Sequence, residues 1–218
     1  MSKELVRVFE ILYSKRKEME DFFDHYIFEA MDIKKYEFID DKNQFKRFID
    51  FCLSTRQQPN KEYDEVAKSQ LEKIYPMLVN LIKQKDIDGL KILIYGTHGI
   101  GQKIGSMMLE MIFLYSNYRD TVVAKQLFVP IDVHIERIFK DSFKIITPKI
   151  GTKPKEKKFI EFQESLDQYT NNQSRIYFDY LWFVGKMFCA KITDEKSKGY
   201  KLCNYCWIKD YCKNDKWL

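Results

Sequence analysis

Glycine and proline are scarce in this chain, and long apolar runs are missing. Only 8 of the 218 residues are glycine and 5 are proline, which argues against a β-sandwich or barrel with many tight turns. No apolar run approaches the roughly 18 residues that a membrane-spanning helix needs. Residues 1–23 mix charged and apolar side chains along an amphipathic helix and do not resemble a secretory signal. We therefore expect a cytoplasmic, nucleoid-associated protein.

The alternation of apolar and polar residues that is typical of half-buried strands is nearly absent. Apolar residues recur instead at helical spacing, which predicts an all-α fold. Helices are expected over residues 5–12, 22–27, 45–54, 61–85, 86–94, 102–115, 131–140, 156–166 and 175–189. Pro76 is expected to bend or break the longest of them, and residues 116–130 are expected to be irregular.

The net charge of +5 does not by itself identify a nucleic-acid-binding protein. Its distribution is uneven, because residues 140–160 carry seven lysines against two acidic residues. Such a run is typical of a solvated linker. It also suits contact with phosphates, where lysines displace counterions from a duplex. Both interpretations stay open.

Four of the five cysteines lie in the last 30 residues, and their spacing indicates a metal site. Cys203 and Cys206 form a C-x2-C pair, Cys212 follows after five residues, and Cys189 precedes them. Four unevenly spaced thiols suit a [4Fe–4S] cluster, although zinc and a set of scattered buried thiols are alternatives. Cys52 lies on an apolar helical face and is expected to belong to the core.

Two further segments carry candidate chemistry. The glycine-x-glycine turn at Gly99 and Gly101 sits between two predicted helices, where it allows positive φ angles and offers main-chain N–H groups to a phosphate. An ordinary corner between helices would have the same pattern. Asp132 precedes another predicted helix, where it is expected to be the N-cap.

Together these segments resemble the helix-hairpin-helix DNA glycosylases, in particular endonuclease III and its iron–sulfur relatives. The C-terminal cysteines follow the family's spacing in their last three positions, while 13 residues separate Cys189 from Cys203, more than in the family. Gly99, Gly101 and Lys103 fall on the glycines and lysine of the family hairpin, with Thr97 and His98 in place of leucine and proline. Asp132 falls on the family's essential aspartate, and Val133 replaces the threonine that follows it.

The resemblance implies a two-lobed architecture and a base-excision repair activity. Residues 36–125 would form a helical barrel domain with the hairpin, and residues 1–35 plus 126–218 a domain with a [4Fe–4S] cluster on Cys189, Cys203, Cys206 and Cys212. Asp132 would assist cleavage of the N-glycosidic bond. Lys103 would form a Schiff base and act as an AP lyase, although a simple phosphate contact by Lys103 is an alternative. His134 is expected to be a structural helix residue rather than a general base.

Lys103 and Asp132 lie 29 positions apart, farther than in endonuclease III, so the connection 117–128 is expected to loop out.

The expected partner is double-stranded DNA that contains a damaged base. The protein is expected to bind it as a monomer and not to associate with a membrane. Gly99, Gly101 and Gln102 would contact the DNA. Arg56, Gln57 or Gln58 would fill the gap left by a flipped base, unless this segment is a plain polar helix end.

An oxidised base is the expected substrate. A mismatch-specific uracil or thymine glycosylase, a non-catalytic damage-binding module and a zinc-stabilised helical scaffold are the alternatives.

Overall fold

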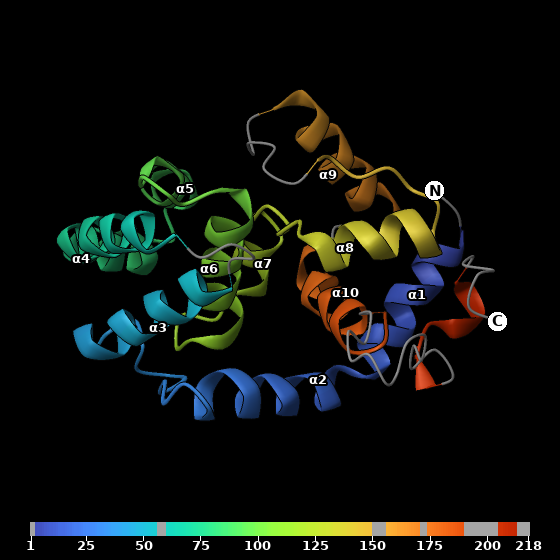
Figure 1. Ribbon diagram of the computed structural model, residues 1–218, viewed down its shortest axis with the longest axis horizontal. Helices are drawn as coiled ribbons and strands as arrows, with labels where there is room; N and C mark the ends of the chain where they lie inside the picture. The colour runs from blue at the N-terminus through green and yellow to red at the C-terminus, as the bar shows by residue number, and fades with distance from the viewer. Residues whose placement is uncertain (1–2, 56–59, 150–155, 171–173, 190–204, 213–218) are drawn as a thin grey trace. The chain divides into compact units, whose positions relative to one another are not determined.

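The computed structural model describes residues 3–55, 60–149, 156–170, 174–189 and 205–212 (Figure 1). Helical residues make up 72% of the structure, and no described residue lies in a strand, so the predicted all-α class is confirmed. Within these ranges no helix is both long enough and apolar enough to cross a membrane.

The chain divides into two compact units, and each is described by itself. Unit 1 consists of Met1–Met19 and Ile131–Leu218, and unit 2 of Glu20–Pro130. The lobes expected from the resemblance have their boundaries after residues 35 and 125, and that division stays a prediction.

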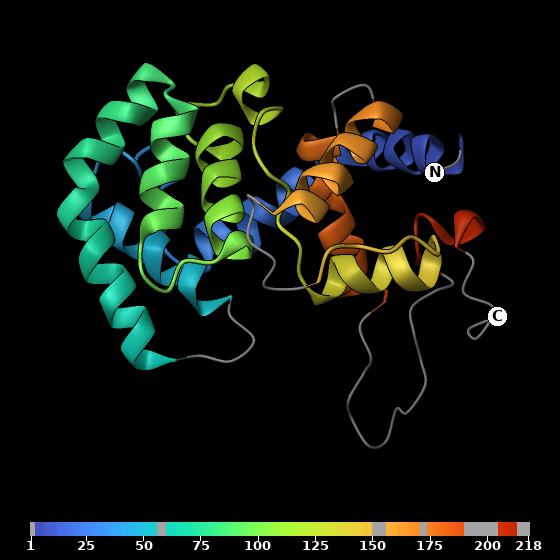
Figure 2. The same ribbon diagram turned by 90° about the horizontal axis from the view of Figure 1, so that it is seen from above.

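Unit 2 is built around four helices that pack on one another. Its elements are the π-helical turn η1 (Asp24–Glu29), α3 (Lys42–Ser54), α4 (Lys61–Gln84), α5 (Ile87–Gly96), α6 (Gln102–Tyr115) and the short α7 (Thr121–Ala124), preceded by the end of α2 (Arg16–Phe23). Helix α5 packs against both α4 and α6, and the three lie side by side in Figure 2. Phe38, Phe48 and Phe113 are fully buried in this unit, and burial of each such side chain contributes about 1.5–3 kcal/mol.

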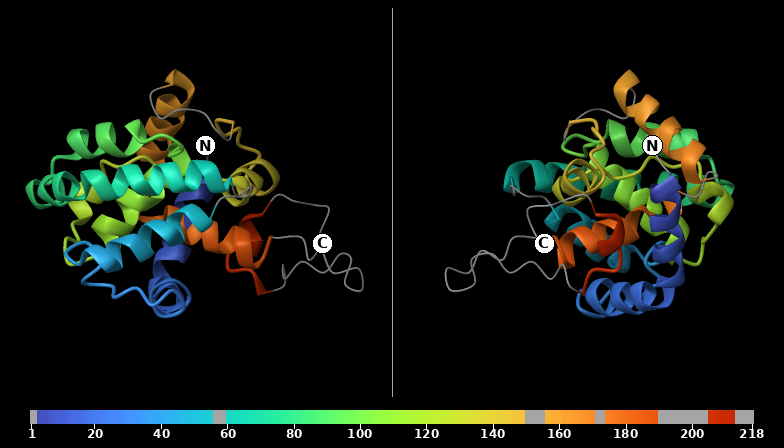
Figure 3. Two further views of the ribbon diagram at one scale, coloured as in Figure 1. Left: turned by 60° about the vertical axis from the view of Figure 1, so that its left-hand side comes forward. Right: turned by 90° about the vertical axis from the view of Figure 1, so that its right-hand side faces the viewer.

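Unit 1 joins the N-terminal helix to residues 131–218. Its elements are α1 (Lys3–Ser14), α8 (Val133–Arg137), the π-helical turn η2 (Ile138–Ser142), α9 (Lys157–Thr170), α10 (Ser174–Met187) and the 3-10 turn η4 (Lys209–Tyr211). Helix α10 packs against α1, α8 and α9, and its contact with α1 is visible in Figure 3. Phe139 and Phe178 are fully buried in this unit. Leu5, Val8 and Leu12 are also buried, which confirms that the apolar stripe of the first helix faces a core.

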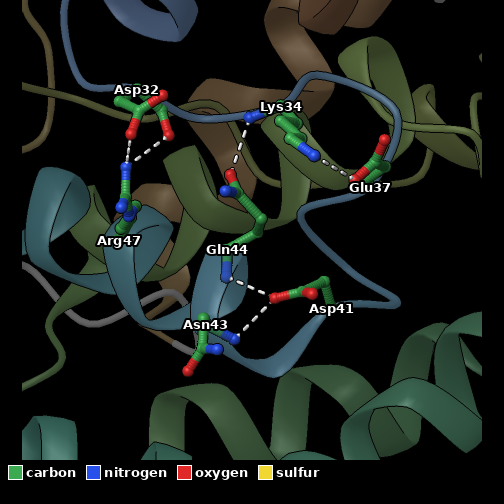
Figure 4. A network of polar contacts seen from close by, with 7 residues as sticks. All are labelled: Asp32, Lys34, Glu37, Asp41, Asn43, Gln44 and Arg47. Carbon is green, nitrogen blue, oxygen red and sulfur yellow. Dashed lines mark hydrogen bonds and ion pairs between the residues drawn. The ribbon is translucent and has the colours of Figure 1, made fainter.

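A polar network fixes the start of α3 (Figure 4). The Asp41 carboxylate accepts hydrogen bonds from the main-chain N–H groups of Asn43 (2.8 Å) and Gln44 (2.9 Å), as an N-cap does. The Gln44 side chain in turn accepts a hydrogen bond from the main-chain N–H of Lys34 (2.7 Å). This network therefore ties the preceding loop to the first turn of α3.

Helix α4 runs without a break through Pro76, so a break is wrong, while a bend at this position stays a prediction. Proline removes one main-chain donor from the helix, but α4 packs against both α3 and α5. Packing along a helix of 24 residues outweighs the local loss of one hydrogen bond.

The connection after α6 does not loop out, and this expectation is also wrong. Asp120 caps α7, accepting hydrogen bonds from the main-chain N–H groups of Val122 (2.9 Å) and Val123 (3.1 Å). Leu127 and Val129 are fully buried, and Lys91 of α5 donates to the main-chain carbonyl of residue 126 (3.1 Å). The segment is folded onto unit 2, because its apolar residues complete the core of that unit.

Candidate functional site

The hairpin between α5 and α6 has the predicted glycine turn. Gly99 adopts a φ of 82°, a left-handed conformation that glycine takes without steric cost. The turn is closed by a hydrogen bond from the Ile100 N–H to the Thr97 carbonyl (3.1 Å), and Thr97 Oγ1 donates to the carbonyl of Leu93 (2.9 Å). Gly101 then precedes α6 as its N-cap residue without a side-chain cap. This is the backbone arrangement that can offer N–H groups to a phosphate.

The two hairpin helices approach closely at Gly105. A Cβ atom at this position would lie 2.5 Å from Cε1 of Tyr95, which no side chain tolerates without movement. The Tyr95 hydroxyl is hydrogen bonded to Ser106 Oγ (2.8 Å), and burial raises the pKa of the Tyr95 phenol. The third glycine of the hairpin segment is thus needed for packing.

Gln102, expected to contact DNA, has its side chain inside unit 2. The residue is only 5% exposed, and its Nε2 donates a hydrogen bond to the main-chain carbonyl of Val129. A DNA contact by Gln102 would therefore use the main chain at the start of α6. The side chain instead ties the hairpin to the segment that leaves unit 2, a role that sequence reasoning missed.

Lys103, the expected Schiff-base lysine, points toward the end of α3. Its Nζ donates a hydrogen bond to the carbonyl of Thr55 (2.7 Å), which is the C-cap residue of that helix. A lysine ammonium at a helix C-terminus is electrostatically favourable. Arg56, Gln57 and Gln58, the expected gap-filling residues, follow Thr55 directly and lie outside the described residues.

Asp132 is the N-cap of α8, as predicted, and it is buried with 4% exposure. Its Oδ1 accepts hydrogen bonds from the main-chain N–H groups of His134 (2.9 Å) and Ile135 (3.1 Å). Its Oδ2 accepts a hydrogen bond from the indole N–H of Trp182 on α10 (3.0 Å). The carboxylate is thus held by three donors. No sequence pattern pointed to Trp182, which lies 50 residues away in the chain.

Lys103 belongs to unit 2 and Asp132 to unit 1. Their joint action on one nucleotide stays a prediction.

His134 packs between α8 and α10. Its ring lies edge-on to the ring of Trp182, with 6.2 Å between the centroids, and its buried Nδ1 makes no hydrogen bond within the described residues. Burial lowers the pKa of His134, and the charges of Arg137 and Lys186 lower it further, while Asp132 and a hydrogen bond with Gly185 oppose the shift. The imidazole is therefore stabilised in its neutral form, which fits a packed helix residue.

The cysteine region is described in part. Cys189, Cys206 and Cys212 are partly exposed and form no disulfides, while Cys52 is buried; Cys203 lies outside the described residues. Among the described residues, no group of three or more metal-ligating side chains is arranged to hold an ion. The donor types still suit a cluster, because iron in such clusters is bound by cysteine thiolates.

The described cysteines are held by neighbouring side chains of unit 1. Arg137 Nη1 donates to the carbonyl of Cys189 (3.0 Å). Trp207, next to Cys206, stacks on Phe183 with 5.3 Å between the ring centroids. These contacts fix the chain at both ends of the segment that contains Cys203.

The lysines of the lysine-rich segment are exposed wherever they are described, although Phe143 and Phe159 of the same segment are buried. Exposed lysines in this part of the chain are Lys140, Lys144, Lys149, Lys157 and Lys158. Lys157 Nζ lies 3.6 Å from Glu161 Oε1 of the same helix, and exposed ion pairs of this kind contribute little to stability. Both interpretations of the run, a solvated face and a phosphate contact, fit this exposure.

Comparison with protein-family models, with curated proteins and with solved structures gives no match for this chain.

Proposed function

We propose that this chain is a base-excision repair DNA glycosylase with AP lyase activity that removes an oxidised base from duplex DNA. The observation that carries the proposal is the Asp132 carboxylate, 4% exposed and accepting three hydrogen bonds. Cleavage of an N-glycosidic bond builds positive charge on the deoxyribose, and a fixed carboxylate stabilises that oxocarbenium-like state. The target base must leave the stack to reach such a site.

Lys103 supplies the nucleophile of the proposed reaction. Its amine, once deprotonated, attacks C1′ of the sugar as the glycosidic bond breaks, and the departing base takes the bonding electrons and one amine proton. The C1′–O4′ bond then breaks, O4′ takes the other amine proton, and the imine remains. Removal of a C2′ proton then expels the 3′ phosphate and breaks the strand. Lys103 starts from a hydrogen bond to the carbonyl of Thr55 (2.7 Å), so this contact must be given up before attack.

The hairpin gives the proposal its DNA-binding element. Gly99 at a φ of 82° and the N-terminus of α6 suit a phosphate, and phosphate contacts position a protein on a duplex without reading its sequence. The proposal requires that Lys103 in unit 2 and Asp132 in unit 1 act on the same nucleotide.

A [4Fe–4S] cluster on Cys189, Cys203, Cys206 and Cys212 belongs to the same proposal. The support is the chemistry of the donors, since Cys189, Cys206 and Cys212 are partly exposed thiols. The cluster would have a structural and DNA-docking role.

The test is a panel of duplexes, each with a single oxidised base, a mismatched uracil or thymine, or no lesion. Wild type is expected to remove oxidised bases and to nick the strand. Asp132→Asn keeps the size of the side chain but removes the negative charge, so we expect base removal to fall by roughly a hundredfold or more. Activity confined to mismatches without nicking supports the mismatch-specific alternative. Binding to lesion duplexes without any excision supports the damage-binding module.

A further inference from the structure

The two oxygens of the Asp132 carboxylate have donors of different origin. Oδ1 is bound by N–H groups of its own helix, from His134 and Ile135, as at any aspartate N-cap. Oδ2 is bound by the Nε1–H of Trp182, at 3.0 Å, from α10. Capping of α8 needs only the two main-chain N–H groups on Oδ1. The hydrogen bond from the Trp182 indole to Oδ2 is therefore not required for capping.

The indole is itself held in place by its neighbours. Lys186 Nζ lies 4.8 Å from the centre of the Trp182 ring, a favourable cation–π distance, and the His134 ring meets it edge-on. Helix α10 can come this close to α8 because residue 185 is glycine. A Cβ at Gly185 would lie 3.0 Å from both Cβ and the carbonyl oxygen of His134. The direction of the indole N–H is therefore set by packing on several sides.

We propose that Trp182 is a positioning residue for Asp132, and this inference rests on the proposed glycosylase function. The two donors on Oδ1 restrain rotation about the Cβ–Cγ bond of Asp132, and the indole N–H adds a further restraint at Oδ2, the oxygen that the capping donors do not bind. A fixed carboxylate needs no reorganisation when positive charge develops on the sugar. Trp182 acts through Asp132 and touches no reacting atom.

The decisive variant is Trp182→Phe, which keeps an aromatic ring but removes the N–H donor. In single-turnover excision on the best lesion duplex we expect a loss of roughly ten- to hundredfold, the usual effect of one hydrogen bond to a charged group. The loss should appear in the excision rate constant at saturating enzyme, while the Kd for the lesion duplex stays unchanged, because the indole acts through Asp132 and does not touch the DNA. Borohydride trapping on a duplex that already contains an abasic site, which needs no base removal, should be retained.

Tyr118→Phe is the matched control. It also removes one donor to an aspartate while keeping the ring, since the Tyr118 hydroxyl donates to Asp40 (2.6 Å) within unit 2. This variant should excise at the wild-type rate. If Trp182→Phe does not fold, an analogue with sulfur in place of the indole N–H, introduced at residue 182, makes the same test with the bicyclic ring intact.

The outcomes separate the positioning role of Trp182 from the proposed glycosylase function. Excision at the wild-type rate in Trp182→Phe overturns the positioning role and leaves the glycosylase function standing. An equal loss of excision and trapping also overturns it, because general damage to unit 1 then explains both. A wild type that removes no base from any duplex overturns the function itself, and the positioning role with it.

Discussion

The ammonium group of Lys103 donates a hydrogen bond to the main-chain carbonyl of Thr55 across 2.7 Å. The lysine of the hairpin is therefore anchored at the end of α3, directly before residues 56–58, which are expected to fill the gap in the duplex. This contact links two elements of the proposed site within unit 2. Removal of the Lys103 amine should therefore affect both imine formation and the contact with Thr55.

Lys103→Gln is expected to abolish covalent trapping by borohydride on an abasic duplex, because an amide cannot form an imine. Loss of the contact with Thr55 should lower the free energy of unfolding by only about 1 kcal/mol. Lys91→Gln is the control, since Lys91 Nζ also donates to a main-chain carbonyl in unit 2 (3.1 Å). A gel of the trapped adducts should show the adduct with Lys91→Gln and none with Lys103→Gln. An undiminished adduct with Lys103→Gln would move the nucleophile elsewhere.

Gly105→Ala should destabilise the hairpin by about 1–3 kcal/mol, as overpacking does. The added methyl group would lie 2.5 Å from Cε1 of Tyr95, whose ring is held by its hydrogen bond to Ser106. Gly96→Ala is the matched control, because a Cβ at Gly96, the last residue of α5, meets nothing within 4 Å. That change should be neutral or stabilising by up to about 1 kcal/mol. Urea unfolding of both variants measures the difference, and equal stability would refute the close approach of α5 and α6.

Much of the helical fold could be predicted because apolar side chains recur at helical spacing, and even α6, which is buried on nearly all its faces, keeps clear ends. Helix α6 begins at Gln102 and ends at Tyr115, as its pattern and the preceding glycine turn indicated. Of the bend or break expected at Pro76, the break is wrong, because the local effect of proline acts on a helix that also packs against α3 and α5. The loop at residues 117–128 was wrong because its apolar residues look isolated in the sequence and become core only when α5 and α6 are in place.

The candidate site was predictable only in its local part. The capping role of Asp132 follows from its position before a helix, and the positive φ of Gly99 follows from the turn. The hydrogen bond from Trp182 to Asp132 and the inward side chain of Gln102 depend on which helices meet. Neither contact leaves a periodic pattern or a spacing in the sequence.

His134 should make the stability of unit 1 depend on pH in a defined direction. Burial lowers the pKa of His134 in the folded state, while the unfolded chain titrates near about 6.5. Between the two values the unfolded chain binds more protons, so the free energy of unfolding falls as the pH decreases through about 6.5 and levels off below the folded-state pKa. Above that range the imidazole is neutral in both the folded and the unfolded state, so it adds no pH dependence to the free energy of unfolding.

Denaturant unfolding between about pH 5 and 8 measures this effect. His134→Gln should flatten the decrease, because the substituted residue does not titrate. His25→Gln is the control for removal of an exposed histidine, since the His25 side chain is 84% exposed. The assignment fails if His134→Gln has the same pH dependence as wild type.

The last prediction concerns the cysteines, which the proposal assigns to a [4Fe–4S] cluster. Protein purified without oxygen should be yellow-brown and contain iron and sulfide, and serine at Cys189, Cys203, Cys206 or Cys212 should remove the colour. Cys52→Ala should keep it, because the Cys52 side chain is buried. That burial raises the pKa of the Cys52 thiol well above its usual range, while metals bind the thiolate. A colourless protein with bound zinc would replace the cluster by a structural zinc site. A metal content unchanged by Cys203→Ser would place the metal on other residues, since a site of four cysteines cannot lose one ligand without weakening its hold on the metal.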